Sequence, residues 1–387
     1  MTSTFLFSGD AWVPSRLVFE TGESFSGFSP KGSEGVYLGE LVFNTGMVGY
    51  VETMTDPSYC GQILNFTYPL IGNYGVHERL TWESTRPHLQ GVVMANLENF
   101  YAKNLSNSSD LSNLSSESFL AWCQRFNIPL MTGVDTREVT KALRSKGVIS
   151  GAIVIGGETA VPKAFINMND TDLVAKVSIK NPIDYFPEGL SEIDKNNLKT
   201  LVLVDCGMKE NILRELRKFK LHIKRVPHDY DFLNKEKTKK IDALFISNGP
   251  GDPTICSQSI LNIKAAMEKN IPTFGICLGS QLMALAVGAK TYKLKFGHRS
   301  QNQPCLELKT DRCFLTSQNH GYAIAEETLP SDWEVTYKNL NDATVQGVAH
   351  RVKPFASVQF HPEASPGPVD TFFLFDEWLL KIGVQRL

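Results

Sequence analysis

The chain has 387 residues, of which 42% are hydrophobic and 21% charged, and its formal net charge at pH 7 is -2. This composition is typical of a soluble globular protein, and it gives no broad electrostatic attraction for nucleic acid or for an anionic membrane surface. At ~150 residues per domain, the length indicates two or three domains, and we expect two.

Targeting and redox signals are weak. The N-terminal residues lack a basic stretch before an apolar run, so we expect neither a signal peptide nor a membrane-spanning segment. The 7 cysteines are scattered and form no C-x-x-C pair, which indicates neither a disulfide framework nor a zinc site. We therefore expect a cytoplasmic protein without a bound metal.

The first 155 residues predict a smaller, β-rich α+β domain, because glycines separate short β-branched or aromatic runs such as 36–42 and 91–94. The polar stretch 104–118 predicts a loop whose end caps a helix over 117–126, since Ser and Asp favour N-cap positions.

A second helix is predicted after Asp135, where Val139 and Leu143 stand at helical spacing and Gly147 is a natural stop. Residues 156–198 carry mixed charge, Asn and Pro without a long periodic run. We expect a linker region there.

From residue 199 to 387, apolar strands alternate with amphipathic helices, which predicts a doubly wound, mostly parallel sheet with helices on both faces. The expected strands are 201–205, 241–247, 272–274 and 355–360, and the expected helices are 209–220, 257–269 and 370–381.

The run Gly275-Ile276-Cys277-Leu278-Gly279 lies between a predicted strand and a predicted helix. Two small residues flank Cys277, as a sharp strand-to-helix turn with an exposed nucleophile requires. A sulfur at a helix N-terminus meets the positive end of the helix dipole, which favours the reactive thiolate. The alternative interpretation is an inert buried cysteine.

His361-Pro362-Glu363 follows the last predicted strand. Extended backbone sends residues i and i+2 to the same side, so the carboxylate can orient the imidazole, and the imidazole can take the thiol proton. A surface turn is the alternative. Because ligands of α/β sheets gather at the carboxyl ends of strands, where Cys277 is also predicted, the two motifs support each other.

The turn Asn248–Pro253 also leaves a predicted strand, and its glycines permit close approach of backbone to a bound group. An N–H of this loop and the N–H of Leu278 could stabilise the oxygen of a tetrahedral intermediate. An ordinary turn is the alternative.

The runs GICLGSQ, SNGPGDP, SQNHGY and FHPEASPGP together resemble the class I, triad-type glutamine amidotransferases. In the first half, VFNTGMVGY, TDPSYCGQIL and GVDTREVTKALRSKG are similar to carbamoyl phosphate synthetase small subunits. The resemblance implies that Cys277 attacks the carboxamide of L-glutamine to give a γ-glutamyl thioester and ammonia, with His361 moving the proton and Glu363 orienting it. It also implies a set of glutamine-binding positions, namely Gly46, Gly249, Gly251, Leu278, Gln281, Asn319, Gly321 and Tyr322.

Three positions depart from the common bacterial pattern. Gly46 stands where many bacterial small subunits have a substrate-contacting serine, Ser280 replaces a frequent histidine, and Tyr322 replaces a frequent phenylalanine. None is a triad member, so these departures concern glutamine affinity more than chemistry.

The resemblance further implies a partner, a large synthetase subunit that uses ATP, Mg²⁺ and bicarbonate and receives the ammonia through a channel. The chain itself would need no cofactor, and residues 1–155 would dock the partner in a heterodimer or higher assembly. The carbamoyl phosphate would serve arginine synthesis, pyrimidine synthesis or both.

Two other functions are open to the same sequence. The chain could be a non-catalytic module that only binds the synthetase, as the departures at Gly46 and Ser280 suggest. It could instead serve another synthetase, of the guanylate or anthranilate type, or be a related peptidase. The additional N-terminal domain argues against this last group.

Overall fold

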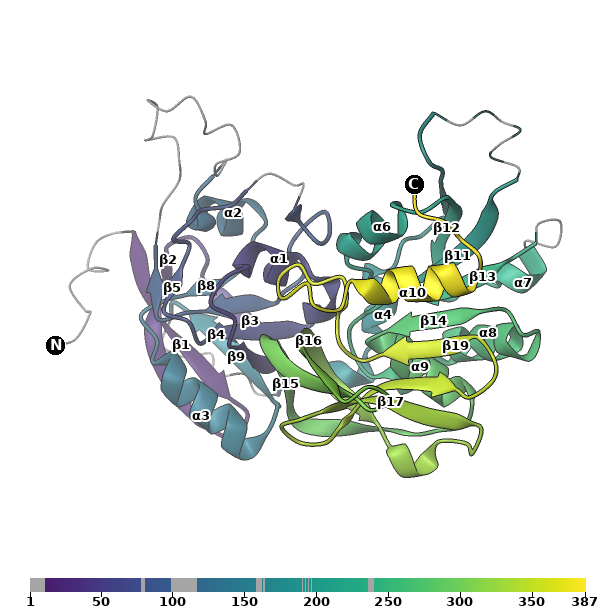
Figure 1. The fold of residues 1–387 in the computed structure, drawn as a ribbon. Coiled ribbons are helices and arrows are strands. Elements are labelled where there is room, and N and C mark those ends of the chain that lie inside the picture. Colours follow the sequence, from purple (N-terminus) through teal and green to yellow (C-terminus); the bar gives the residue numbers. More distant parts are fainter. Residues whose placement is uncertain are drawn as a thin grey trace. The chain divides into compact units, whose positions relative to one another are not determined.

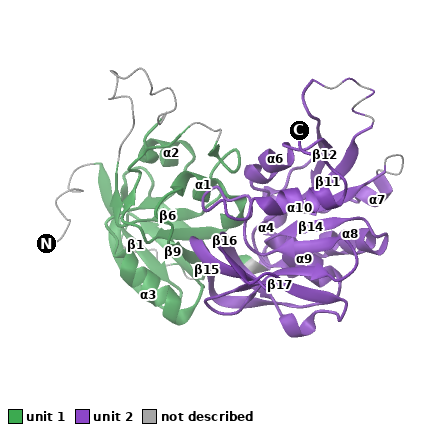
Figure 2. Ribbon diagram, viewed as in Figure 1, with its two compact units in different colours: residues 1–168 green, residues 169–387 purple. Residues whose placement is uncertain are grey.

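The computed structural model describes residues 11–77, 81–98, 117–157, 162, 164–189, 191, 193, 195, 197–235 and 240–387. The chain divides into two compact units, residues 1–168 and 169–387 (Figure 2). This division falls inside the range 156–198 in which we expected a linker. Most of the expected loop 104–118 lies outside the described residues.

The described part of the first unit contains a seven-stranded sheet in the order β2-β1-β9-β3-β4-β6-β8 (Figure 1). Its strands are β1 (Trp12–Phe19), β2 (Ser24–Pro30), β3 (Gly35–Asn44), β4 (Gln62–Phe66), β6 (Gly91–Val93), β8 (Leu130–Met131) and β9 (Ile149–Ile155). A small sheet pairs β5 (Leu70–Ile71) with β7 (Asn96–Leu97), and the helices are α1 (Tyr50–Thr55), η2 (Pro57–Tyr59), α2 (Phe119–Arg125) and α3 (Thr136–Lys146). The β-rich α+β character expected from the sequence is confirmed.

Both expected helices of this unit form where their capping residues place them. The Ser118 hydroxyl accepts from the Ala121 N–H at the start of α2, and the Asp135 carboxylate accepts from the Glu138 N–H at the start of α3. Gly147 ends α3 by donating its N–H to the Leu143 carbonyl. Side-chain caps satisfy backbone donors that a helix leaves unpaired, so these two helix starts are encoded locally.

The described part of the second unit contains a ten-stranded sheet in the order β10-β12-β11-β13-β14-β19-β18-β17-β15-β16. Its strands are β10 (Ile183–Tyr185), β11 (Lys199–Asp205), β12 (Leu221–Pro227), β13 (Ala243–Ile246), β14 (Thr273–Ile276), β15 (Thr291–Glu307), β16 (Arg312–Ile324), β17 (Trp333–Asn339), β18 (Val345–His350) and β19 (Phe355–Val358). The short η5 (Met168–Asp170) spans the boundary between the units in sequence. The helices of the second unit are α4 (Leu173–Val177), α6 (Glu210–Leu216), α7 (Phe232–Lys235), η6 (Pro253–Ile255), α8 (Ser257–Glu268), α9 (Leu278–Ala286), η7 (Glu326–Thr328) and α10 (Phe373–Lys381).

The neighbours β12, β11, β13, β14 and β19 run parallel, as the alternation of strands and helices predicts. Antiparallel strands extend this parallel core from β19 through β18 and β17 to the long β15–β16 hairpin. The sequence pattern predicts no strand over residues 221–227 or 291–350, where β12 and β15 to β18 form. This extension places the SQNHGY run on β16.

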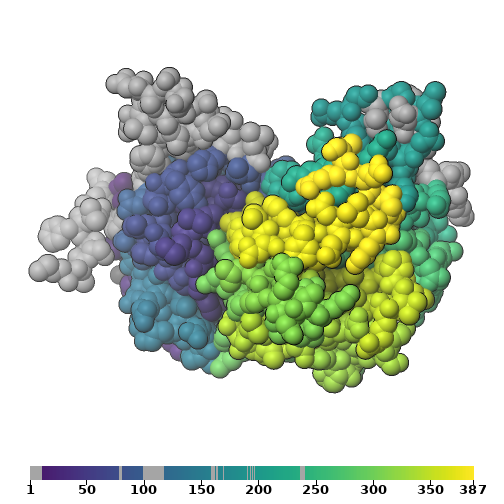
Figure 3. All heavy atoms as spheres, in the orientation of Figure 1, coloured from purple at the N-terminus to yellow at the C-terminus, as the bar shows by residue number. Residues whose placement is uncertain are grey.

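Both faces of the parallel core are covered by helices. Alternate residues of β11 point to opposite faces, so Leu203 packs in a cluster with residues of α6 and α10, whereas Val204 packs in a cluster with residues of α8 and α9. Helix α10, yellow in the space-filling view, lies at the surface of this unit with Trp378 turned into the core (Figure 3). Among the described residues, no helix is long and apolar enough to cross a membrane.

Candidate active site

Cys277 lies at the corner between β14 and α9, as the sequence predicts. Its backbone has φ 55° and ψ -107°, a conformation that costs a non-glycine residue free energy and that occurs where a nucleophile is presented at a sharp turn. The corner is held because the Cys277 N–H donates to the Val358 carbonyl (2.8 Å), while the Cys277 carbonyl accepts from the N–H groups of Ser280 (3.0 Å) and Gln281 (3.2 Å).

The glycines beside Cys277 let helix α9 approach the sheet closely. A Cβ at Gly275 would lie 2.7 Å from backbone atoms of Gly279, and a Cβ at Gly279 would lie 2.3 Å from the Ile246 carbonyl oxygen. Neither contact can be relieved by moving a flexible side chain. The small residues of the motif are therefore required by packing as well as by the turn.

We expect Gly279→Ala to lower the free energy of unfolding by roughly 1–3 kcal/mol, because it forces overpacking against the β13 backbone. Thermal unfolding of the purified protein measures this loss. Gly321→Ala is the matched control, since a Cβ there would meet only the end of the Arg299 side chain at 3.4 Å. Equal melting temperatures for the two variants would contradict the steric explanation.

The sulfur of Cys277 is nearly buried, with the residue 2% exposed. Its thiol donates to the Asn319 carbonyl at 3.7 Å, which links the elbow to β16. The N–H of Leu278 belongs to the first turn of α9, where backbone donors have no intrahelical partner. The Cys277 sulfur and a backbone N–H without an intrahelical partner thus occupy the same corner.

His361 and Glu363 form a buried pair next to this corner. Nδ1 of His361 and Oε1 of Glu363 are 2.6 Å apart, with the residues 2% and 0% exposed. The His361 N–H donates to the Ser317 carbonyl (2.9 Å), which fixes the backbone of His361 against β16. Nε2 makes no hydrogen bond of standard geometry, and the Cys277 side chain interacts with this imidazole. The arrangement leaves Nε2 available to the thiol.

The charges of the site reinforce one another. Burial lowers the pKa of His361, but the Glu363 carboxylate and the Cys277 side chain raise it more, to about 10. Burial likewise raises the pKa of Glu363, but Lys209 and His361 lower it more, to about 2. At neutral pH the pair is therefore an imidazolium beside a carboxylate, the state that favours a neighbouring thiolate.

Glu363→Gln removes the largest influence that raises the pKa of His361, and we expect the imidazolium to lose its proton at lower pH. If glutamine turnover requires the imidazolium, its alkaline limb near pH 10 should move down by about 1–3 pH units. The pH profile of kcat/KM for glutamine measures this, with the exposed Glu334→Gln as control. An unshifted limb would show that another group sets it.

Sequence reasoning missed two residues at the start of α6. Lys209, 3% exposed, places Nζ 3.2 Å from Glu363 Oε1 and also donates to the Ala364 carbonyl. The Asn211 side chain donates to the Glu363 carbonyl. A cation in the short turn between β11 and α6 was the available signal, because parallel strands present such residues at one edge of the sheet. Lys209 thus pairs with the carboxylate beside His361, and Asn211 holds the backbone of the same glutamate.

The Asn248–Pro253 turn lies beside the elbow. Gly249 packs so tightly that a Cβ would fall 2.1 Å from the Cys206 carbonyl oxygen and 2.7 Å from the Leu278 side chain, and Gly251 has φ +86°. The structure therefore brings Gly249 and Leu278 together. Only glycine fits at these positions, which leaves the loop backbone open to a bound group.

Gln281 and the β16 run are also joined. Gln281 Nε2 donates to the Tyr322 carbonyl (3.0 Å) and to Gln359 Oε1 (3.0 Å), and Asn319 meets the sulfur as described. Gly321 lies between Asn319 and Tyr322 on the same strand. Ser280 is turned away from this group, because its hydroxyl pairs with that of Ser357 at 2.8 Å. Ser280, one of the three departures from the bacterial pattern, is therefore hydrogen-bonded to β19.

Gly46 belongs to the first unit, where its N–H donates to Asn44 Oδ1 at 2.6 Å. The site described above consists of second-unit residues. Within the described residues, no group of three or more His, Cys, Asp or Glu side chains is arranged to hold a metal ion.

A cysteine elbow and a His–Glu pair at the carboxyl ends of parallel strands define a class of hydrolytic site, and residues 202–380 match the family model "Glutamine amidotransferase class-I". The second unit is thus a class I glutamine amidotransferase domain. Residues 17–153 match the model "Carbamoyl-phosphate synthase small chain, CPSase domain". The chain belongs to the carbamoyl phosphate synthase small chain family.

Known proteins are similar to this chain over nearly its whole length. The arginine-specific small chain of carbamoyl phosphate synthase from Saccharomyces cerevisiae is 43% identical over 97% of this chain and 90% of its own length. The multifunctional protein CAD of Squalus acanthias is 45% identical over 95% of this chain, which spans only 16% of that protein. Among solved structures, a glutamine amidotransferase of Thermotoga maritima aligns with 48% of this chain and 85% of its own, at 19% identity and a TM-score of 0.34.

Proposed function

We propose that the chain hydrolyses L-glutamine to glutamate and ammonia through Cys277, His361 and Glu363. The observation that carries the proposal is the strained corner at Cys277 beside a buried imidazole that a carboxylate holds at 2.6 Å. The three groups divide the chemistry among them. The sulfur attacks, the imidazole moves the proton, and the carboxylate orients the ring and stabilises its charge.

In the first step, the Cys277 sulfur, as a thiolate beside the His361 imidazolium, adds to the carboxamide carbon of glutamine. The N–H of Leu278 and backbone of the Gly249–Gly251 turn stabilise the resulting oxyanion. When the carbon–nitrogen bond breaks, the imidazolium protonates the leaving nitrogen. The products are ammonia and a γ-glutamyl thioester on Cys277.

In the second step, His361 takes a proton from water, and the hydroxyl adds to the thioester carbon. Collapse of that intermediate breaks the carbon–sulfur bond and releases glutamate, which leaves the thiolate beside the protonated His361. Gln281 would bind the amino acid end of the substrate, and Asn319, Gly321 and Tyr322 would add further contacts to glutamine.

The ammonia would pass to a carbamoyl phosphate synthetase large subunit, which would use ATP, Mg²⁺ and bicarbonate to make carbamoyl phosphate. The family match over residues 17–153 supports this partner. The relatives include arginine-specific small chains and multifunctional proteins. Arginine synthesis and pyrimidine synthesis are therefore both proposed uses of the carbamoyl phosphate. Cysteines without disulfides, Cys277 included, suit a cytoplasmic enzyme.

Trapping the thioester tests the proposal directly. The protein is mixed with glutamine, quenched in acid within the first turnovers, digested and analysed by mass spectrometry. We expect a glutamyl adduct on the peptide that carries Cys277. The exposed Cys313 is an internal control and should stay unmodified.

The outcomes separate the competing functions. A non-catalytic module would form no adduct and release no glutamate, even with the large subunit present. A chain that serves a different synthetase would form the adduct but copurify with that other enzyme. Either result would overturn the corresponding part of the proposal.

A further inference from the structure

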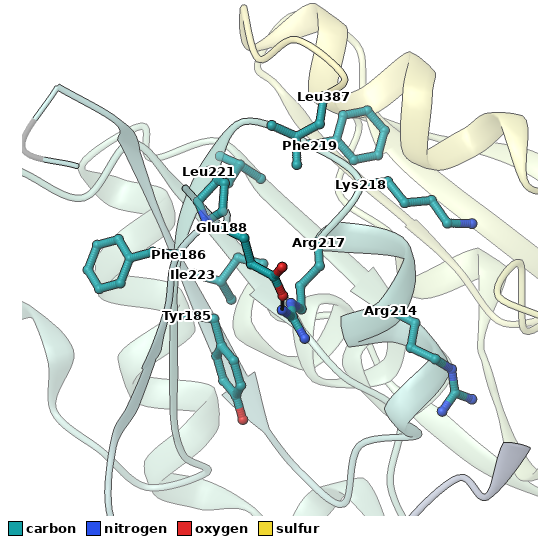
Figure 4. A pocket seen from close by; sticks show the side chains of 11 residues that line it. Tyr185, Phe186, Glu188, Arg214, Arg217, Lys218, Phe219, Leu221, Ile223 and Leu387 are labelled. Carbon is teal, nitrogen blue, oxygen red and sulfur yellow. Dashed lines mark ion pairs between the residues drawn. The ribbon is translucent and has the colours of Figure 1, made fainter. Parts of the chain in front are cut away.

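A cavity of about 510 Å³ lies at the edge of the second unit formed by β10, β12 and α6 (Figure 4). Leu221 and Ile223 of β12 form an apolar wall, and Tyr185 of β10 adds an aromatic ring. These residues are separate from the triad and from the proposed glutamine pocket. The proposed function leaves the cavity without a role.

Positive charge gathers along one side of this cavity. Arg214, Arg217 and Lys218 line it, and Glu188 is the acidic side chain in the lining. Lys218 is already paired with Glu215 at 2.6 Å, whereas Arg217 meets Glu188 at 3.7 Å. The Glu188 side chain is 93% exposed and that of Arg217 is 48% exposed, so this contact is weak and opens readily.

Figure 4 shows the Glu188 carboxylate reaching the Arg217 guanidinium from the opposite wall of the cavity. The carboxylate therefore occupies the place that the anionic group of a ligand would take. A guanidinium binds phosphate oxygens in the same forked geometry that it uses for carboxylates. The neighbouring apolar and aromatic walls suit a flat, largely apolar body.

We propose that this cavity binds a small organic phosphate with a planar ring, the phosphate displacing Glu188 from Arg217 and the ring packing against Tyr185, Leu221 and Ile223. Glu188 then competes with the phosphate for Arg217 and so lowers the affinity of the cavity for the ligand. Inorganic phosphate has the charge without the ring and would bind more weakly.

The cavity is joined to the catalytic carboxylate through α6. Arg214 Nε donates to Asn211 Oδ1 at 2.7 Å, and the Asn211 amide donates to the Glu363 carbonyl. The residue before the helix is Lys209, which holds the Glu363 carboxylate at 3.2 Å. A phosphate that draws Arg214 toward the cavity would loosen Asn211, so occupancy would alter how Glu363 holds His361. This coupling rests on the proposed glutaminase function, whereas the binding site does not.

Isothermal titration calorimetry of the full chain tests the site without any turnover, with phenyl phosphate, inorganic phosphate and phenol as probes. We expect phenyl phosphate to bind about tenfold or more tightly than either fragment. Arg217→Gln should weaken it about tenfold or more, and Glu188→Gln should tighten it severalfold. The exposed Lys141→Gln, in the other unit, is the matched control and should change nothing.

Absence of phenyl phosphate binding, or binding that Arg217→Gln and Glu188→Gln leave unchanged, would overturn the site. The coupling is tested separately, by measuring kcat, KM and the alkaline pKa of glutamine hydrolysis with and without saturating phenyl phosphate. We expect a change in kcat or in that pKa that Arg214→Lys abolishes, since lysine keeps the charge but lacks the Nε donor. Unchanged kinetics with proven binding would refute the coupling alone, and a chain that binds the probe without hydrolysing glutamine would refute the glutaminase alone.

Discussion

Cys277→Ala is expected to reduce glutamine-dependent carbamoyl phosphate synthesis by about 10³-fold or more, because no other group at the elbow can form the acyl intermediate. Synthesis from added ammonia should survive, since the ammonia site belongs to the proposed large subunit. Both rates are measured on the complex with that subunit, at matched protein concentrations.

The substitution should leave the backbone strain at this corner nearly unchanged, because position 277 keeps its positive φ of 55°. A fall in both rates would therefore point to a broken assembly, not to a lost nucleophile. Cys313→Ala, at an exposed free cysteine on β16, is the matched control and should leave both rates unchanged. Retained glutamine-dependent synthesis in Cys277→Ala would rule out the assignment of the nucleophile.

Lys209→Met is expected to have the second largest effect. It keeps the volume of the side chain but leaves Glu363, 0% exposed, with one cation fewer. Breaking a buried ion pair in this way should lower the free energy of unfolding by roughly 3 kcal/mol. Because Glu363 would also hold His361 less firmly, glutamine turnover should fall by about 10²-fold.

The pH dependence of unfolding gives a signature that lost packing alone would not produce. The pKa of Glu363 is depressed to about 2 in the folded protein. The stability that its carboxylate contributes is therefore fully present at pH values above the ordinary pKa of a glutamate, and it is lost as the pH falls through about 2. Without Lys209 that pKa rises toward its ordinary value, so the acid loss of stability due to Glu363 should be smaller and should be complete at a higher pH.

Lys141→Met is the control, since Lys141 forms an exposed pair with Glu138 whose removal should cost less than about 1 kcal/mol. Denaturant unfolding at several pH values measures both variants. Equal stability and an unmoved acid transition in Lys209→Met would show that Glu363 does not depend on this cation.

The helices of the first unit and the parallel core of the second were predictable because their signals are local. Ser118, Asp135 and Gly147 cap α2 and α3 from within a few residues of sequence. The alternation of apolar strands with helices likewise specified β11, β13, β14 and β19. Residues 291–350 carried no comparable signal, because the pairing of β15 with β16 and β17 depends on contacts between segments far apart in the chain.

The sequence alone was enough to propose Cys277, His361 and Glu363 as the reactive residues. Each stands in a short motif, and its turn and its side-chain direction follow from neighbouring residues. The residues that surround them became visible only in the folded chain. Lys209 and Asn211 reach Glu363 from α6, more than 150 residues earlier in the chain, as the ion pair and the amide contact show. Lys209 and Asn211 reach Glu363 because parallel strands pack with their carboxyl ends at one edge of the sheet. Residues that follow those ends meet there, whatever their separation in sequence.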